Sequence, residues 1–242
     1  MARYFLEVSY NGTAYSGYQS QQNANTIQGE IEKAFQIFQK DKITMIGSSR
    51  TDAGVHALQN FFHFDYNTEI NPHFIYKMNA ILPDDIVIKG LKPVSDNAHC
   101  RFDALSREYS YYIYCQKDPF LKNKAFFFPY KLDIEKLQKT AAIIKEYTDF
   151  TSFSKRKTQA KTFLCQIIES TWLFENNILI YNVKANRFLR GMVRALTATM
   201  LKVGRGKLTL NEFRNIILAK DCTMASFAVP AHGLFLKSVE YP

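Results

Sequence analysis

The stretch GSSRTDAGVHAL, residues 47 to 58 of this 242-residue chain, combines turn-forming residues with a carboxylate and an arginine. Asp52 followed two residues later by Gly54 is typical of a turn, and Ser and Thr favour loops. If residues 50 to 52 are extended, Arg50 and Asp52 point to the same side, because side chains alternate. An arginine near that carboxylate would keep it ionised, which suits a nucleophile or an electrostatic stabiliser. The stretch therefore predicts a turn that presents a charged Asp52.

The composition indicates a polyanionic partner. The net charge of +9 results from 31 Lys and Arg against 22 Asp and Glu, which favours nucleic acid or an anionic membrane surface. The 14 Tyr and 20 Phe favour nucleic acid, because aromatic rings stack on bases. An ordinary basic protein is the alternative that charge alone leaves open.

The cysteines and the apolar residues indicate the cellular compartment in which the protein is expected. Cys100, Cys115, Cys165 and Cys222 lie far apart with no C-x-x-C pair, which predicts a reducing, cytoplasmic environment. The strand-like start MARYFLEVSY is unlike an export signal, and no run of about 18 apolar residues follows, so we expect no membrane association. The five histidines show no metal-ligand spacing, so we expect no metal site.

Hydrophobic periodicity divides the chain into two similar series. The first has strands at 3–10, 61–66 and 85–91 and helices at 26–38 and 75–82. The second has a strand at 108–115, a helix at 133–147, a hairpin turning at Asn176-Asn177, helices from about Asn186 to Val203 and from Thr209, and a closing strand GLFLKSVEY. Asp133 is the expected N-cap of the helix at 133–147, and Thr209 with Glu212 is expected to form a capping box. We predict an α+β protein with two lobes, residues 1–104 and 105–242.

Several stretches, in order, resemble the bacterial tRNA pseudouridine synthase A family. SSRTDAGVHA is similar to the family's active-site signature, in which the Asp is catalytic. Further similar segments are YNGTAYSGYQSQ, MNAILPDDI, LSREYSYYIY, RFLRGMVRAL and PAHGLFLKSVEYP, so the resemblance covers nearly the whole chain. Two positions depart from the family pattern: Tyr18 stands where Trp is usual, and Cys222 where Arg is common.

The resemblance implies a fold and an activity. The fold is the pseudouridine synthase fold, in which two similar α+β lobes with mainly antiparallel sheets flank a basic central cleft. The activity is isomerisation of uridine to pseudouridine in the anticodon arm of tRNA, at the positions conventionally numbered 38 to 40. The resemblance also implies a homodimer that needs no cofactor; tRNA is the expected partner, and no DNA is expected.

The resemblance also assigns roles to residues whose motifs match. Asp52 takes the role of the nucleophile that acts on a flipped-out uridine, and Tyr109 that of the residue that packs on the target base. Arg194 matches the arginine that pairs with the aspartate, and Arg50 the arginine that occupies the space left by the extruded base. By pattern alone, Tyr109 is also compatible with a core tyrosine in a Tyr-rich strand.

Two basic segments are candidates for contacts with the RNA backbone. Arg187, Arg190 and Arg194 are three and four residues apart and would share one side of the expected helix. The loop at 154–161 contributes Lys155, Arg156 and Lys157. Cations that contact phosphates provide affinity without reading sequence, although such groups are also common on solvated surfaces.

The sequence leaves three routes open for Asp52: attack on the sugar C1′, addition to C6 of the ring, or removal of a proton from C2′ to leave a glycal. Two rival functions remain beside these routes. One is a non-catalytic tRNA-binding protein. The other is a nucleoside hydrolase or base glycosylase, which normally needs a second carboxylate to activate water.

Overall fold

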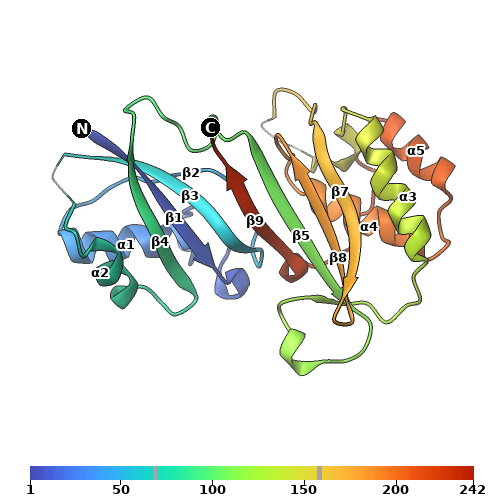
Figure 1. Cartoon of the computed structure of the whole chain (residues 1–242), viewed down its shortest axis with the longest axis horizontal. Helices are drawn as coiled ribbons and strands as arrows, with labels where there is room; N and C mark the ends of the chain where they lie inside the picture. The colour runs from blue at the N-terminus through green and yellow to red at the C-terminus, as the bar shows by residue number, and fades with distance from the viewer. Residues whose placement is uncertain (68–69, 157–159) are drawn as a thin grey trace. The chain divides into compact units, whose positions relative to one another are not determined.

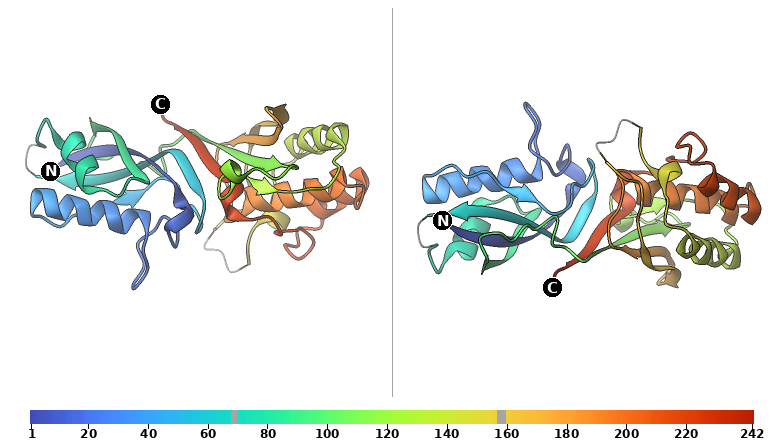
Figure 2. Two further views of the ribbon diagram at one scale, coloured as in Figure 1. Left: turned by 90° about the horizontal axis from the view of Figure 1, so that it is seen from below. Right: turned by 90° about the horizontal axis from the view of Figure 1, so that it is seen from above.

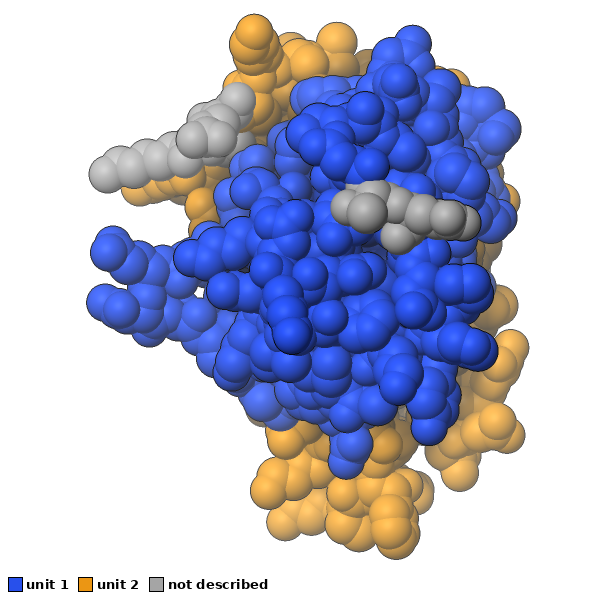
Figure 3. All heavy atoms as spheres, turned by 90° about the vertical axis from the view of Figure 1, so that its left-hand side faces the viewer, with its two compact units in different colours: residues 1–105, 235–242 blue, residues 106–234 orange. Residues whose placement is uncertain are grey.

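The computed structural model describes residues 1–67, 70–156 and 160–242 (Figure 1). The chain divides into two compact units, coloured separately in Figure 3: residues 1–105 with 235–242 form unit 1, and residues 106–234 form unit 2. The sequence placed one boundary near Ala104 and assigned all of 105–242 to the second lobe. Residues 235–242 instead belong to unit 1, so the chain returns to its first unit after completing the second.

Unit 1 contains a sheet in which β1 (Ala2–Tyr10) is flanked by two antiparallel neighbours, β3 (His56–Tyr66) and β4 (Ile86–Val94). The short β2 (Ile46–Gly47) pairs antiparallel with β3, and β9 (Leu234–Glu240) pairs parallel with the beginning of β3. Leu6 and Val8 of β1 are fully buried and alternate with less buried residues. This alternation with period two defines the core face of the sheet.

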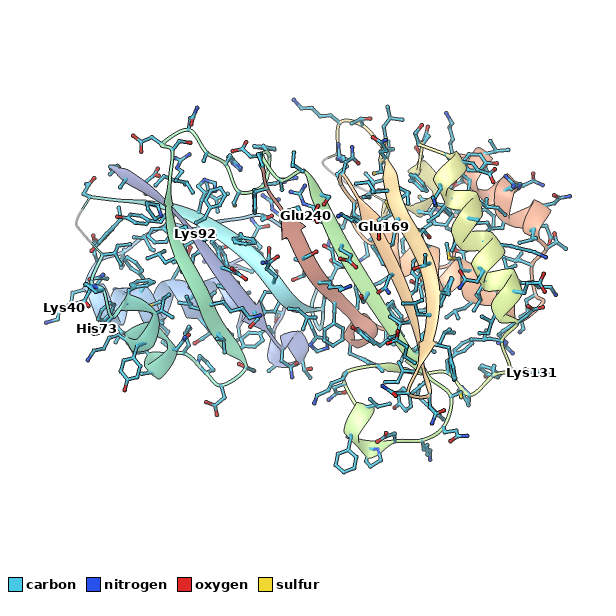
Figure 4. All side chains as sticks on the ribbon, in the orientation of Figure 1. Lys40, His73, Lys92, Lys131, Glu169 and Glu240 are labelled. Carbon is cyan, nitrogen blue, oxygen red and sulfur yellow. The ribbon has the colours of Figure 1, made fainter. Side chains whose placement is uncertain are left out.

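Two helices supply the rest of the unit 1 core: α1 (Ile27–Gln39) and α2 (Phe74–Ile81). Figure 2 shows α1 running along one face of the strands. Thr26 caps α1 by accepting a hydrogen bond from the Gly29 N–H, and Lys40, labelled in Figure 4, ends it in the left-handed conformation at φ 56°. Phe35 of α1 packs edge-on against Phe64 of β3 and Phe74 of α2. The helix predicted at 26–38 is confirmed.

Among the strands of unit 2, β8 (Ile178–Ala185) lies antiparallel between β5 (Ser106–Tyr114) and β7 (Ile167–Glu175). The short β6 (Phe126–Phe127) adds to β5 in parallel. Asn176 and Asn177 form the two-residue turn between β7 and β8 with φ values of 49° and 63°. The predicted hairpin is confirmed, and most strand pairs of both units are antiparallel, as expected.

Three helices complete unit 2: α3 (Ile134–Ile143), α4 (Met192–Gly204) and α5 (Leu210–Leu218). Nearly every residue of α4 is buried, and it packs against both α3 and α5. Thr209 and Glu212 form the predicted capping box of α5, with the Thr209 hydroxyl accepting from the Glu212 N–H at 3.1 Å. Asp133 caps α3, also as predicted.

One helix begins later than the sequence indicated. We expected a helix from about Asn186, but α4 starts at Met192. Strand β8 continues to Ala185, and Gly191 adopts φ 76°, a left-handed conformation that an α-helix does not contain. Arg187 and Arg190 therefore lie on the segment before α4, and the expected arginine stripe along one helix is wrong.

Candidate active site

The signature loop (residues 48–55) joins β2 to β3 in unit 1 and rests on a chain of buried hydrogen bonds. The side-chain amide of Asn60 donates to the Ser49 carbonyl at 3.1 Å and to the Tyr10 hydroxyl at 3.2 Å. The Tyr10 hydroxyl bonds in turn to Thr51 Oγ1 at 2.8 Å. Asn60 has no exposed surface, so these bonds lie out of contact with water. They fix the loop on both sides of residue 50.

Burial alternates from Ser49 to Asp52 of the signature loop. Ser49 and Thr51 are buried, Arg50 is exposed, and Asp52 is half-buried. This alternation is that of an extended segment, the condition under which Arg50 and Asp52 point to the same side. The loop therefore directs Arg50 to solvent and leaves Asp52 partly accessible.

The turn that follows Asp52 depends on glycine. The Val55 N–H donates to the Asp52 carbonyl at 3.2 Å, and Gly54 adopts φ 77°. A positive φ at the third residue of a turn favours glycine, because other side chains meet the backbone there. The predicted turn at Gly54 is confirmed, and it places Asp52 as the last residue before the bend.

The segment after β1 backs the signature loop from the other side. The Tyr18 N–H donates to the Thr51 carbonyl at 3.2 Å, and the Gly12 N–H donates to His56 Nδ1 at 3.2 Å. A β-carbon added at Gly12 would overlap the Val55 carbonyl, so the two backbones approach as closely as glycine permits. Residues 12–18 are thus a rigid support for the turn that carries Asp52.

Tyr18, the departure from the usual Trp, fills the space behind the loop with its ring. The ring is 1% exposed and stacks on Phe62 with centroids 4.7 Å apart. A β-carbon at Gly47 would overlap this ring, which explains a glycine at the end of β2. Burial raises the pKa of the Tyr18 hydroxyl well above its usual value, so it remains a neutral phenol.

Tyr109 lies on β5 of unit 2, opposite Val183 of β8. Its ring is half-buried and meets the Phe188 ring edge-on, with centroids 5.1 Å apart. Tyr111, two residues further along, is the fully buried core tyrosine, and its hydroxyl donates to the Pro230 carbonyl at 2.7 Å. Tyr111, and not Tyr109, is therefore the core tyrosine of this strand, and the Tyr109 ring is held partly at the surface.

Arg194 lies in the first turn of α4, also in unit 2. Its Nε and Nη2 donate to the Val229 carbonyl at 3.1 Å and 2.7 Å. A two-point hydrogen bond fixes the plane of a guanidinium as well as its position. The segment before η5 (Ala231–Gly233) thus holds this side chain of α4 in place.

The two basic segments named from the sequence meet in unit 2. The Lys155 N–H donates to the Arg190 carbonyl at 3.0 Å, and the Lys155 side chain covers Gly191. Arg190 and Arg156 are exposed, whereas Arg187 is half-buried. The structure therefore brings the two segments together through a backbone contact, although Arg194 alone of the three arginines lies on a helix. Lys157 lies outside the described residues.

The sequence did not single out Asn60 or Tyr10, which organise the signature loop. The sequence does contain a signal for Asn60. An amide in the middle of the apolar strand HALQNFFHF is unusual and indicates a buried side chain with hydrogen-bond partners. The partner of that amide could not be read from the pattern, because Tyr10 and Ser49 are distant in sequence.

The described residues lack two further kinds of feature. In this part of the chain, no three His, Cys, Asp or Glu side chains gather closely enough to hold a metal ion. Nor does any helix there combine the length and the apolar composition needed to cross a membrane.

The sequence is similar to those of known proteins over nearly its whole length. A model of the tRNA pseudouridine synthase family matches residues 7–103 and 147–242. The tRNA pseudouridine synthase A of Parabacteroides distasonis is 44% identical, with 100% of this chain and 97% of that protein covered. The enzyme of the same name from Porphyromonas gingivalis is 42% identical over 100% and 98% of the two chains, and that from Bacillus subtilis is 36% identical over 97% of each. The chain therefore belongs to the tRNA pseudouridine synthase A family.

Proposed function

We propose that the protein isomerises uridine to pseudouridine in the anticodon arm of tRNA, at positions 38 to 40, with Asp52 as the nucleophile. The observation that carries the proposal is the signature loop, in which Asp52 is half-buried at a turn while its neighbours Ser49 and Thr51 are anchored by buried hydrogen bonds. A carboxylate on so fixed a support needs little reorganisation to meet a substrate. Family membership supplies the reaction type.

The reaction conserves every atom of the nucleoside. The bond from uracil N1 to C1′ breaks, the base turns, a bond from C5 to C1′ forms, and the proton on C5 is lost while N1 becomes protonated. No redox step or external group donor is needed. A paired uridine must first leave the helix, which costs a few kcal/mol of stacking and pairing.

Asp52 can act by any of three routes: an ester with C1′, an adduct at C6, or proton removal from C2′. In each, the carboxylate is restored when the C5 to C1′ bond is complete. Tyr109 packs on the base, Arg194 pairs with the carboxylate, and Arg50 fills the space of the extruded base. The anchoring of Arg194 by Val229 and of Tyr109 by Phe188 supports these roles, because both side chains are held in one orientation.

Affinity for tRNA comes from phosphate contacts by Lys155, Arg156, Arg187 and Arg190, supported by the approach of their two segments. The enzyme acts as a homodimer in the cytoplasm and requires no cofactor. The reducing compartment is supported by the four cysteines, none of which forms a disulfide in the described residues.

An assay on unmodified tRNA transcript tests the proposal. Wild type is incubated with the transcript, and pseudouridine is mapped by chemical derivatisation and primer extension. We expect pseudouridine at positions 38 to 40, and a loss of at least about 10³-fold in rate for Asp52→Asn, because an amide is not a nucleophile of comparable strength.

Asp84→Asn is the matched control, since Asp84 is an exposed carboxylate at the turn between α2 and β4 of the same unit. It should retain full activity. Binding without pseudouridine would favour a non-catalytic tRNA-binding protein, and release of free uracil would favour a glycosylase. Full activity of Asp52→Asn would remove Asp52 from the mechanism.

A further inference from the structure

Unit 2 contains a cleft of about 640 Å³ whose walls come from two distant segments. One wall is formed by β5, β6 and the loop between them, and includes Lys122 and Phe127. The other is formed by residues 227–232, including Phe227 and His232, together with Arg194 of α4. The volume lies within the range of about 300 to 1,000 Å³ that is typical of ligand sites.

The walls of the cleft are held in place by their own hydrogen bonds. Strand β6 pairs with β5, and the Phe128 N–H extends the pairing by donating to the Tyr114 carbonyl at 2.8 Å. On the other side, the Tyr111 hydroxyl fixes the Pro230 carbonyl, and the Arg194 guanidinium fixes the Val229 carbonyl. Hydrogen bonds therefore secure both walls of this open cleft.

The lining combines aromatic rings with positive charge. Tyr114, Phe126, Phe127 and Phe227 supply rings, and Lys122 and Arg194 supply cations, while none of the described residues that line the cleft is acidic. His232 adds little charge at neutral pH, because burial lowers the pKa of its imidazole. Rings that stack on a base, beside cations that bind a phosphate, are the combination by which proteins bind unpaired nucleotides.

We propose that this cleft binds one unpaired nucleotide of the tRNA next to the target uridine, with its base against Phe127 and Phe227 and its phosphate near Lys122. The inference rests on the proposed function, because Arg194 belongs both to the catalytic set and to the cleft wall. A side chain shared in this way suits two nucleotides that are consecutive in one strand. The cleft thus contributes to the choice of substrate, whereas the chemistry remains with Asp52.

Steady-state kinetics on tRNA transcript test the proposal. We expect Lys122→Ala and Phe227→Leu each to raise KM about tenfold, as loss of a phosphate or stacking contact does, with kcat nearly unchanged. Lys124→Ala is the matched control: Lys124 is exposed on the same loop but does not line the cleft, so its KM should stay at the wild-type value. Thermal unfolding of each variant checks that the fold is intact. Because Lys122 is exposed, its variant keeps the test valid if Phe227→Leu fails to fold.

A second substrate series identifies the nucleotide. The base of each nucleotide within two positions of the target is removed in turn, giving abasic transcripts. At one position, removal should raise KM for wild type but cause no further increase for Phe227→Leu, because both changes delete one stacking contact.

Independent, multiplying losses at every position would overturn the proposal, as would unchanged KM in both cleft variants. A fall in kcat without a change in KM would instead place the cleft in the chemical step and also overturn it. These outcomes differ from failure of the proposed function, in which wild type forms no pseudouridine at all.

Discussion

At the residue scale, the signature loop depends on buried side chains and on a glycine behind it. Asn60 and Tyr10 hold the loop from inside the sheet, and Gly12 allows a second segment to lie directly against Val55. These residues position Asp52 without taking part in its chemistry. Their substitution should therefore change the rate of reaction more than the affinity for tRNA.

Gly12→Ala tests this positioning. The added methyl group overlaps the Val55 carbonyl, and since neither backbone can accommodate it in place, the turn after Asp52 must move. We expect kcat to fall at least about tenfold, because misplacement of a reacting group by about 1 Å can cost 10²-fold. Steady-state kinetics on tRNA transcript measure the effect.

Gly206→Ala is the matched glycine control. Gly206 has φ 69° and nothing within 4 Å of an added β-carbon, so the substitution strains the backbone but displaces no neighbour. It should lower the free energy of unfolding by about 1 kcal/mol and leave kcat unchanged. Equal kcat in the Gly12 and Gly206 variants would contradict the positioning role of Gly12.

At the element scale, local sequence signals predicted those elements whose causes are local. The Asn176-Asn177 turn, the Asp133 cap and the Thr209–Glu212 box each depend on residues within a few positions of one another, and all were found where expected. The start of α4 was wrong, because strand pairing carried β8 to Ala185 and a left-handed Gly191 followed. The spacing of the arginines in the sequence reveals neither the strand pairing nor the conformation of Gly191.

Two substitutions in the hairpin turn are expected to change the stability in opposite directions. Asn177 has φ 63°, a conformation that glycine adopts at no steric cost and alanine adopts at a cost of about 1 kcal/mol. We expect Asn177→Gly to raise the urea midpoint of unfolding and Asn177→Ala to lower it. A shift of both variants in the same direction would show that the side chain of Asn177, and not its backbone, sets the stability of the hairpin.

The candidate site was predictable only in part at this scale. Asp52, Arg50 and the turn at Gly54 lie within one short motif, so the sequence could place them together. The partners of Tyr109 and Arg194, namely Phe188 and Val229, come from other elements. Such contacts arise from the packing of strands and helices, and a short sequence motif does not predict that packing.

At the scale of the whole molecule, the net charge of +9 predicts a salt-dependent interaction with tRNA. We expect the logarithm of the dissociation constant to rise linearly with the logarithm of salt concentration. Lys155→Ala and Arg190→Ala should each reduce that slope by about 1, because each removes one phosphate contact. Filter binding across a salt series measures the slopes.

Lys33→Ala is the control for this series, since Lys33 is an exposed lysine on α1 of the other unit. Its slope should equal that of wild type. A flat response of wild type to salt would contradict phosphate binding altogether, and an unchanged slope for both unit 2 variants would exclude their two side chains from it.

The return of the chain to unit 1 also sets an order of events during synthesis. Strand β9 pairs with the first residues of β3, and Phe235 stacks on His56 with ring centroids 4.4 Å apart, directly after the signature loop. A ribosome that has made residues 1–105 has therefore made a unit whose sheet edge, beside the signature loop, is still unpaired. That edge is covered only after all of unit 2 has emerged, so the Asp52 support is finished late, and the nascent chain must keep the edge from pairing elsewhere until then.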